Sequence, residues 1–283
     1  MSQHPEPLIL LTGGTGTTGR RIADRLRARN VPVRCASRAG SPPFDWDRPE
    51  TWAATLDGAK SAYIAYSPDL TIPGAVGTVD RFCAAARESG VEQLVLLAGR
   101  GEKAAEAAED VVRASGLRST IVRASWFDQN FSEGMLRQAV LDGTIALPAG
   151  TVREPFVDVE DIADVVVAAL LEPGHDGRTY DVTGPRLITF AEAADELAAA
   201  TGRSVAYLDV SPADFYAGAV ADGVPAPLAQ ALLLVFESVL DGRNEHLGHG
   251  VHEALGRCAR DFREFVARSA SEGEWSAVAQ GGR

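Results

Sequence analysis

Residues 8–19 read LILLTGGTGTTG, and an amphipathic stretch at 20–26 follows them directly. An apolar run, a tight glycine loop and a helix in this order are typical of the strand, loop and helix that bind a dinucleotide. Gly14, Gly16 and Gly19 fit the G-x-G-x-x-G spacing, and Gly13 opens an equally spaced variant. We therefore predict that a pyrophosphate binds at the N-terminus of this helix. The residues expected to contact it are Gly13, Gly14, Thr15, Gly16, Thr17, Thr18 and Gly19. The alternative is a plain surface loop.

The end of the next apolar stretch indicates which dinucleotide is favoured. Residues 33–38 read VRCASR, so Ser37 and Arg38 end a second predicted strand. An acidic residue here would bind the ribose 2′-hydroxyl of NAD, whereas a hydroxyl and a guanidinium suit the 2′-phosphate of NADP. We predict NADP(H), and the alternative is a solvated arginine at a strand end. Asp45 and Trp46 are candidates to cover the adenine.

Strand-like and helix-like segments alternate along the first two thirds of the chain. This pattern predicts an α/β fold with a doubly wound parallel sheet, the Rossmann fold. Further strands are expected at 61–66, 93–98, 119–123 and 179–182, and helices at 74–89, 102–115 and 162–171. Ligands in such sheets bind outside the carboxyl ends of the strands, so the loops at these ends are expected to share one cleft.

The domain organisation follows from where this alternation stops. We expect residues 1–184 to form the nucleotide-binding domain. Residues 185–268, which are mostly helical in pattern, are expected to form a smaller lobe over the cleft, with contributions from 125–157 and a short strand at 205–208. Residues 269–283 are expected to be a flexible tail.

Composition narrows the class of partner. The net charge of −12 argues against sequence-independent binding to nucleic acid or to an anionic membrane, since both require clustered Lys and Arg. No apolar run approaches the length of a membrane span. The three widely spaced cysteines suit a reducing compartment rather than a disulfide framework. We therefore expect a cytoplasmic protein, monomeric or homodimeric, that acts on a small molecule.

Two familiar kinds of catalytic centre are missing. An ordinary short-chain dehydrogenase protonates its substrate with Tyr-x-x-x-Lys, and none of the five tyrosines has a lysine four residues later. Tyr66 and Lys103 remain as candidates for a catalytic or cofactor contact, with Ala98 at a strand end. His246, His249 and His252 are three residues apart, but glycines interrupt that segment and no carboxylate stands at a metallopeptidase spacing, so we predict no metal site.

Several motifs together are similar to a known family. They are TGGTGTTG at 12–19, ASR at 36–38, Glu109 shortly before SGL at 115–117, and TIVRASWFDQNF at 120–131. This set resembles the NmrA-like atypical short-chain dehydrogenase/reductases. Within the family it is most similar to the branch of ergot-alkaloid iminium reductases, the agroclavine and festuclavine dehydrogenases, and next to the type-2 NADPH quinone reductases. The resemblance extends over nearly the whole chain, to about residue 268.

The resemblance implies NADPH binding and hydride delivery to an electrophile that requires little acid from the protein. An iminium ion, a quinone or an enone fits that requirement, and secondary metabolism is the expected setting. Trp126, Phe127 and Phe131 could form a substrate wall or ordinary core, and Asn130 could orient substrate or cap the next helix. Two other functions stay open: a regulator that senses NADP(H) without turnover, and an isomerase or epimerase that uses bound cofactor.

Overall fold

Six parallel strands form the central sheet of the computed structural model, which describes residues 7–276. They are β1 (Leu8–Thr12), β2 (Val33–Ala36), β3 (Ala59–Ile64), β4 (Gln93–Gly99), β5 (Arg118–Ala124) and β8 (Thr179–Val182). Their spatial order is β2-β1-β3-β4-β5-β8, so the direction of winding reverses between β1 and β3. This is the doubly wound Rossmann arrangement expected from the sequence.

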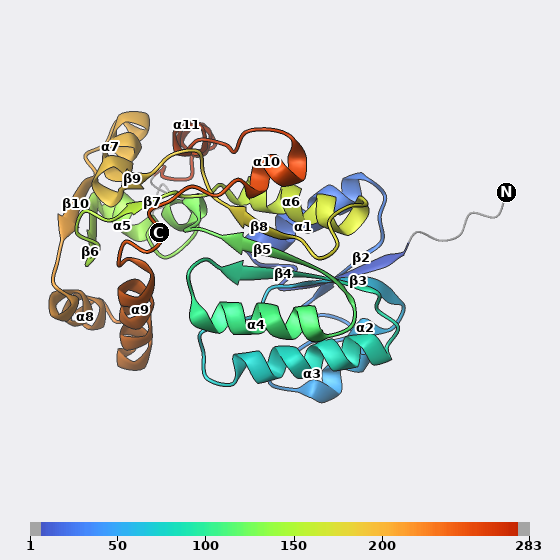
Figure 1. Ribbon diagram of the computed structural model, residues 1–283. Coiled ribbons are helices and arrows are strands. Elements are labelled where there is room, and N and C mark those ends of the chain that lie inside the picture. The colour runs from blue at the N-terminus through green and yellow to red at the C-terminus, as the bar shows by residue number, and fades with distance from the viewer. Residues whose placement is uncertain (1–6, 277–283) are drawn as a thin grey trace, which may run out of the picture. The chain divides into compact units, whose positions relative to one another are not determined.

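Helices cover both faces of the sheet (Figure 1). On one face lie α1 (Thr17–Ala28) and α6 (Val159–Leu171), and on the other lie α3 (Ala75–Glu88) and α4 (Lys103–Ala114). A short 3-10 turn, η1 (Pro49–Thr51), leads into α2 (Trp52–Leu56), which packs on α3. The glycine loop connects β1 to α1 at the carboxyl end of β1, next to the point where the winding reverses.

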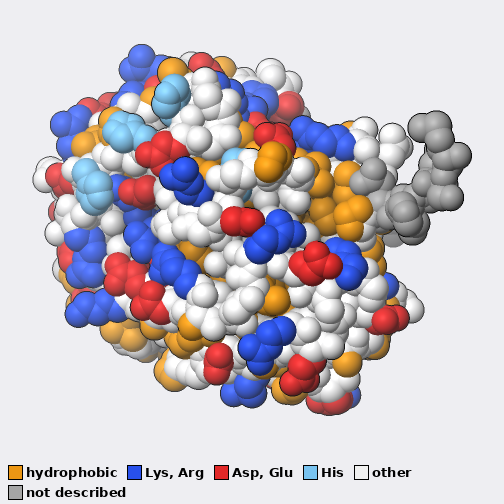
Figure 2. Space-filling view, turned by 45° about the vertical axis from the view of Figure 1, so that its right-hand side comes forward, with side chains coloured by type: hydrophobic (Ala, Val, Ile, Leu, Met, Phe, Trp, Pro, Cys, Tyr) orange, Lys and Arg blue, Asp and Glu red, His pale blue; other side chains and the backbone are white. Residues whose placement is uncertain are grey.

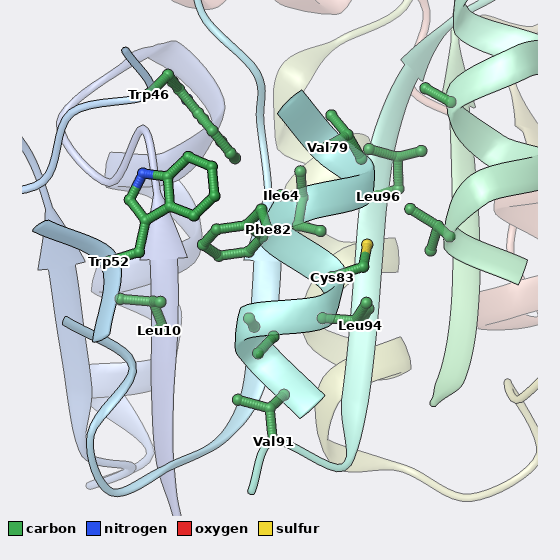
Figure 3. Packing of buried hydrophobic residues seen from close by; sticks show 14 of the residues in the cluster. Leu10, Trp46, Trp52, Ile64, Val79, Phe82, Cys83, Val91, Leu94 and Leu96 are labelled. Atoms are coloured by element: carbon green, nitrogen blue, oxygen red, sulfur yellow. The ribbon is translucent and has the colours of Figure 1, made fainter. Parts of the chain in front are cut away.

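The core on the α3 face shows why these segments fold as they do (Figure 3). Buried residues of α3 recur three or four positions apart, which gives the helix one apolar stripe. From this stripe Val79 lies beside Leu96 of β4, and Phe82 packs on Trp52 of α2 with 5.6 Å between ring centres; all four side chains are buried. Burial of apolar surface stabilises the folded state by about 25 cal/mol per Å². Residues such as these therefore supply most of the free energy that favours folding.

The chain divides into two compact units. The sheet unit contains the described residues up to Ala124, together with Val159–Val182 and Gly248–Cys258. The helical unit contains Ser125–Asp158, Thr183–Leu247 and the described residues from Ala259 onward. The chain therefore passes from one unit to the other five times.

The helical unit is built from short strands and longer helices. Its elements are η2 (Asp128–Phe131), α5 (Arg137–Asp142), β6 (Thr144–Leu147), β7 (Arg153–Glu154), β9 (Ile188–Thr189), α7 (Phe190–Thr201), β10 (Ala206–Asp209), α8 (Pro212–Ala221), α9 (Ala226–Val239) and α11 (Phe262–Ser271). The strand expected at 205–208 is β10, and it pairs in parallel with β6. Phe131, Phe156, Phe190 and Phe262 form the centre of this unit's core.

One segment assigned to the helical lobe from its sequence lies elsewhere. Gly248–Cys258, which includes α10 (Gly250–Leu255), belongs to the sheet unit. Arg257 at its end pairs with Asp161 at 2.7 Å and with Asp164 at 2.6 Å, both on α6. The sequence pattern of 248–258 shows a helix but not these two ion pairs, which is why the assignment missed it.

The first part of the segment expected to be a flexible tail is anchored. Residues 269–271 complete α11, and the Trp275 side chain is buried, with its indole N–H donating to the Phe131 carbonyl at 2.7 Å. Arg137 also donates to the Glu274 carbonyl at 2.9 Å. The chain is therefore anchored as far as Trp275, and residues 277–283 lie outside the part that the structure describes.

On the face drawn in Figure 2, Lys and Arg side chains are interspersed with Asp and Glu side chains. None of the helices within residues 7–276 has the length and apolar character that a membrane span requires. His246, His249 and His252 are all exposed, and no cluster of His, Cys, Asp and Glu among the described residues could hold a metal ion. The three cysteines are free thiols.

Candidate functional site

The glycine loop folds back on itself so closely that side chains would not fit. Gly13 has φ of +66°, a conformation that glycine adopts without steric cost. A Cβ on Gly14 would lie 2.7 Å from the Cβ of Cys35 on β2, and one on Gly19 would lie 2.1 Å from the Gly13 carbonyl oxygen. These two glycines therefore let α1 and β2 approach the loop backbone.

The N-terminus of α1 has the features of an anion-binding site. Its N-cap is Gly16, which has no side chain to accept from the first N–H groups, and the first turn carries no acidic residue. Thr15 and Gly16 are exposed. The first backbone N–H groups of a helix have no partner within it, and together with the helix dipole they bind phosphate. The loop therefore has the geometry that a dinucleotide pyrophosphate requires.

Hydrogen bonds between buried groups of β1, β3 and α1 support the glycine loop. The Tyr63 hydroxyl donates to the Thr18 hydroxyl at 2.9 Å, and the Thr12 hydroxyl donates to the Tyr63 carbonyl at 3.0 Å. The Thr12 hydroxyl also accepts from the Ala65 N–H at 2.9 Å. Burial raises the pKa of Tyr63 far above its ordinary value, so this tyrosine stays neutral and acts as a support. Thr18 is thus fixed by β3, whose sequence alone did not indicate this role.

Ser37 and Arg38 follow β2 at the carboxyl edge of the sheet. The Ser37 carbonyl accepts from the N–H groups of Gly40 and Phe44, which closes the turn. The Arg38 side chain is exposed and has no hydrogen-bond or ion-pair partner among the described residues. Its guanidinium is therefore available to an incoming anion. These features fit the 2′-phosphate end of NADP.

The residues expected near the adenine, Asp45 and Trp46, make contacts within the protein. Trp46 is 8% exposed and packs in an aromatic cluster with Phe44, Trp52 and Phe82, so most of its ring belongs to the core. Asp45 accepts from the Trp52 indole N–H through its carbonyl at 2.8 Å. Tyr66 is half-buried and lies 4.9 Å from Trp46, ring centre to ring centre. Only Asp45 and Tyr66 keep substantial exposed surface.

The segment after β4 contains a carboxyl that the sequence analysis missed. Ala98 is buried within β4, and Lys103 is exposed at the start of α4. Between them, the Glu102 carboxyl packs against Gly99, where a Cβ would lie 2.4 Å from it. Burial, and secondarily the charge of Asp69, raise the pKa of Glu102 to about 7. A glycine three residues before an acid was the available sequence signal.

The predicted substrate wall is only partly exposed. Phe131 is fully buried among Phe156, Phe190 and Phe262, which favours the core position over the wall, the two alternatives that the sequence leaves open. Trp126 and Phe127 are half-buried and keep some surface.

Asn130 does not cap the next helix. The N-cap of α5 is Leu136, which makes no side-chain cap, and the Asn130 amide oxygen lies instead beside Gly134. The residues that the sequence assigns to cofactor belong to the sheet unit, and those assigned to substrate belong to the helical unit.

Known reductases are similar to this chain in sequence. No family model matches the sequence. A Streptomyces griseus relative, (4-alkanoyl-5-oxo-2,5-dihydrofuran-3-yl)methyl phosphate reductase, is 31% identical over 93% of this chain and 98% of its own length. Agroclavine dehydrogenase of Claviceps fusiformis is 28% identical over 92% of this chain and 96% of its own length.

A solved structure shares the fold. The NADPH-dependent quinone oxidoreductase of Escherichia coli, complexed with NADPH, superposes with a TM-score of 0.78 at 21% identity, over 92% of this chain and 99% of that one. The chain belongs to the NmrA-like atypical short-chain dehydrogenase/reductase family. As a member of the NmrA-like family it is an NAD(P)H-dependent reductase with a Rossmann domain.

Proposed function

We propose that this NmrA-like reductase uses NADPH to reduce a small conjugated or cationic electrophile, with iminium ions, quinones and enones as the substrate classes. The observation that carries the cofactor preference is Arg38, exposed and unpaired after β2. A guanidinium binds a phosphate through charge-assisted hydrogen bonds that a ribose hydroxyl cannot match. Bound NADPH would supply the hydride.

The roles of the chain's own residues follow from their positions. The backbone N–H groups at the start of α1 would bind the pyrophosphate, and the Tyr63–Thr18 hydrogen bond would keep the loop in place. Trp126 and Phe127 would offer apolar surface to the substrate, with Asn130 as a polar contact. Orientation of bound reactants can supply a large part of a reductase's rate enhancement.

The missing Tyr-x-x-x-Lys supports an activated substrate. A plain ketone becomes an alkoxide when it accepts hydride and therefore needs a strong acid nearby, whereas an iminium ion becomes a neutral amine. The substrate named for the Streptomyces griseus relative is a dihydrofuran that carries an oxo and an alkanoyl group, so its ring is electron-poor. Activated electrophiles of this kind suit a site without the tyrosine acid.

The test is NADPH oxidation, followed by its near-ultraviolet absorbance, over a panel of quinones, cyclic iminium ions and enones. We expect turnover of at least one class, and loss of turnover in Gly16→Val. Gly16 has φ of −79° and ψ of −178°, which any residue can adopt, so the variant should fold while its side chain obstructs the pyrophosphate. Tight binding of NADPH and NADP⁺ without any turnover would instead favour a sensor.

A further inference from the structure

The Glu102 side chain occupies an unusual position at the carboxyl end of β4. Glu102 is the N-cap residue of α4, yet its side chain makes no capping hydrogen bond. Its carboxyl group instead lies against the Cα of Gly99, where a Cβ would come within 2.4 Å of the carboxyl carbon and of Oε2. A side chain at position 99 would therefore displace the Glu102 carboxyl from this position.

The surroundings of this carboxyl do not stabilise its charged form. Among the described residues it has no hydrogen-bond or ion-pair partner. Arg100, in the same turn, is committed to Asp181 at 2.8 Å, and Lys103 and Glu106 are exposed on α4. From the loop after β3, Asp69 acts on it with a like charge. Burial and this like charge raise the pKa of Glu102 to about 7, so a substantial fraction of the group is protonated at neutral pH.

The position also matches where chemistry takes place in this fold. Ligands of doubly wound sheets bind outside the carboxyl ends of the strands, beside the reversal point. Here that point lies between β1 and β3, and β4 is the next strand. We infer that Glu102 is the catalytic proton donor of this reductase and that its preferred substrates are neutral conjugated carbonyl compounds, enones or quinones, which need a proton as well as a hydride. This inference rests on the proposed function and specifies its substrate class.

The proton balance of the step is complete. When hydride adds to the β-carbon of an enone, the carbon–carbon π electrons move toward oxygen and form an enolate. The Glu102 O–H bond breaks, its proton joins the enolate, and the carboxylate regains a proton from water. NADPH ends as NADP⁺, so one hydride and one proton are consumed. An iminium ion takes hydride alone and has no use for Glu102.

The experiment compares one variant on two substrates. Glu102→Gln keeps the size of the side chain but cannot release a proton, and Glu106→Gln on the same helix is the matched control. We expect Glu102→Gln to lower kcat for an enone by about 10²–10⁴-fold and to leave kcat for a preformed cyclic iminium ion and the NADPH Kd within about threefold. The control should match wild type on both substrates.

Two further measurements do not depend on that variant. In the protein without cofactor, the infrared band of a protonated carboxyl should be present at about pH 6 and disappear as the pH rises through about 7. Asp69→Asn keeps an oxygen for the Thr71 hydrogen bonds but removes the repulsion, so the alkaline limb of the enone pH profile should move to lower pH.

The outcomes separate this inference from the proposed function. Equal losses on the two substrates in Glu102→Gln, no infrared band, or an unmoved alkaline limb in Asp69→Asn would each overturn Glu102 as the donor while the reductase stands. Absence of wild-type turnover for all three classes, iminium ions, quinones and enones, would overturn the proposed function and this inference with it.

Discussion

Arg38 keeps its full capacity for an incoming anion, because no described residue pairs with it. We expect Arg38→Asp to weaken NADPH binding by about tenfold to a hundredfold and NADH binding much less. A charge-assisted hydrogen bond is worth about 1.5–3 kcal/mol, and the introduced carboxylate adds repulsion. Arg178→Asp, another exposed arginine of the sheet unit, changes net charge equally and serves as the control in a fluorescence titration. Equal losses for NADPH and NADH would contradict this role.

Substitution of Tyr63 tests whether its hydrogen bond to Thr18 contributes to NADPH binding. Tyr63→Phe removes the donor to Thr18, and we expect it to lower the free energy of unfolding by about 0.5–1.5 kcal/mol and to weaken NADPH binding severalfold. Tyr180→Phe is the matched control, since it removes a buried 2.7 Å hydrogen bond to His175 away from the loop. Thermal unfolding and NADPH titration of both variants check this. A binding loss of the same size in Tyr180→Phe would show that Thr18 is not positioned by Tyr63.

At the scale of elements, α1 packs so closely on its own loop at Gly19 that a methyl group has no room there. In Gly19→Ala the added Cβ would lie 2.1 Å from the Gly13 carbonyl oxygen, so the loop must move, and overpacking of this kind costs about 1–3 kcal/mol. Gly77→Ala in the exposed part of α3 should instead stabilise by up to about 1 kcal/mol. Urea unfolding and NADPH titration measure both effects. Wild-type stability and affinity in Gly19→Ala would refute the packing argument.

The helices and strands also show how much of the fold the sequence predicts. The glycine loop and the alternation of segments predict the six strands to within a few residues, because period and turn chemistry are local properties. The pairing of β6 with β10 joins residues about sixty positions apart and leaves no local trace. Phe131 has the same sequence appearance in a wall as in a core. Glu102 gains its environment from Gly99 and Asp69, and only folding brings Asp69 near.

Over the whole molecule, Glu102 links stability to pH. Its pKa is about 7 in the folded protein against an ordinary value of 4.5, so between these values the folded state holds a proton that the unfolded state has lost. The contribution of this group to the free energy of unfolding is therefore constant below 4.5 and falls as pH rises toward 7. We expect the Tm of wild type to fall relative to Glu102→Gln from about pH 5 to about pH 8, as scanning calorimetry would record. A constant difference would show that the pKa is not raised.

The five passages of the chain between the sheet unit and the helical unit constrain how such a protein can be altered. Neither unit corresponds to one continuous stretch of gene, so neither can be acquired, deleted or exchanged by a single recombination event. To transplant the helical unit of one family member onto another requires three separate exchanges, of 125–158, 183–247 and the segment after 258. New substrate ranges in this architecture should therefore arise by accumulated point substitutions and loop changes rather than by domain shuffling.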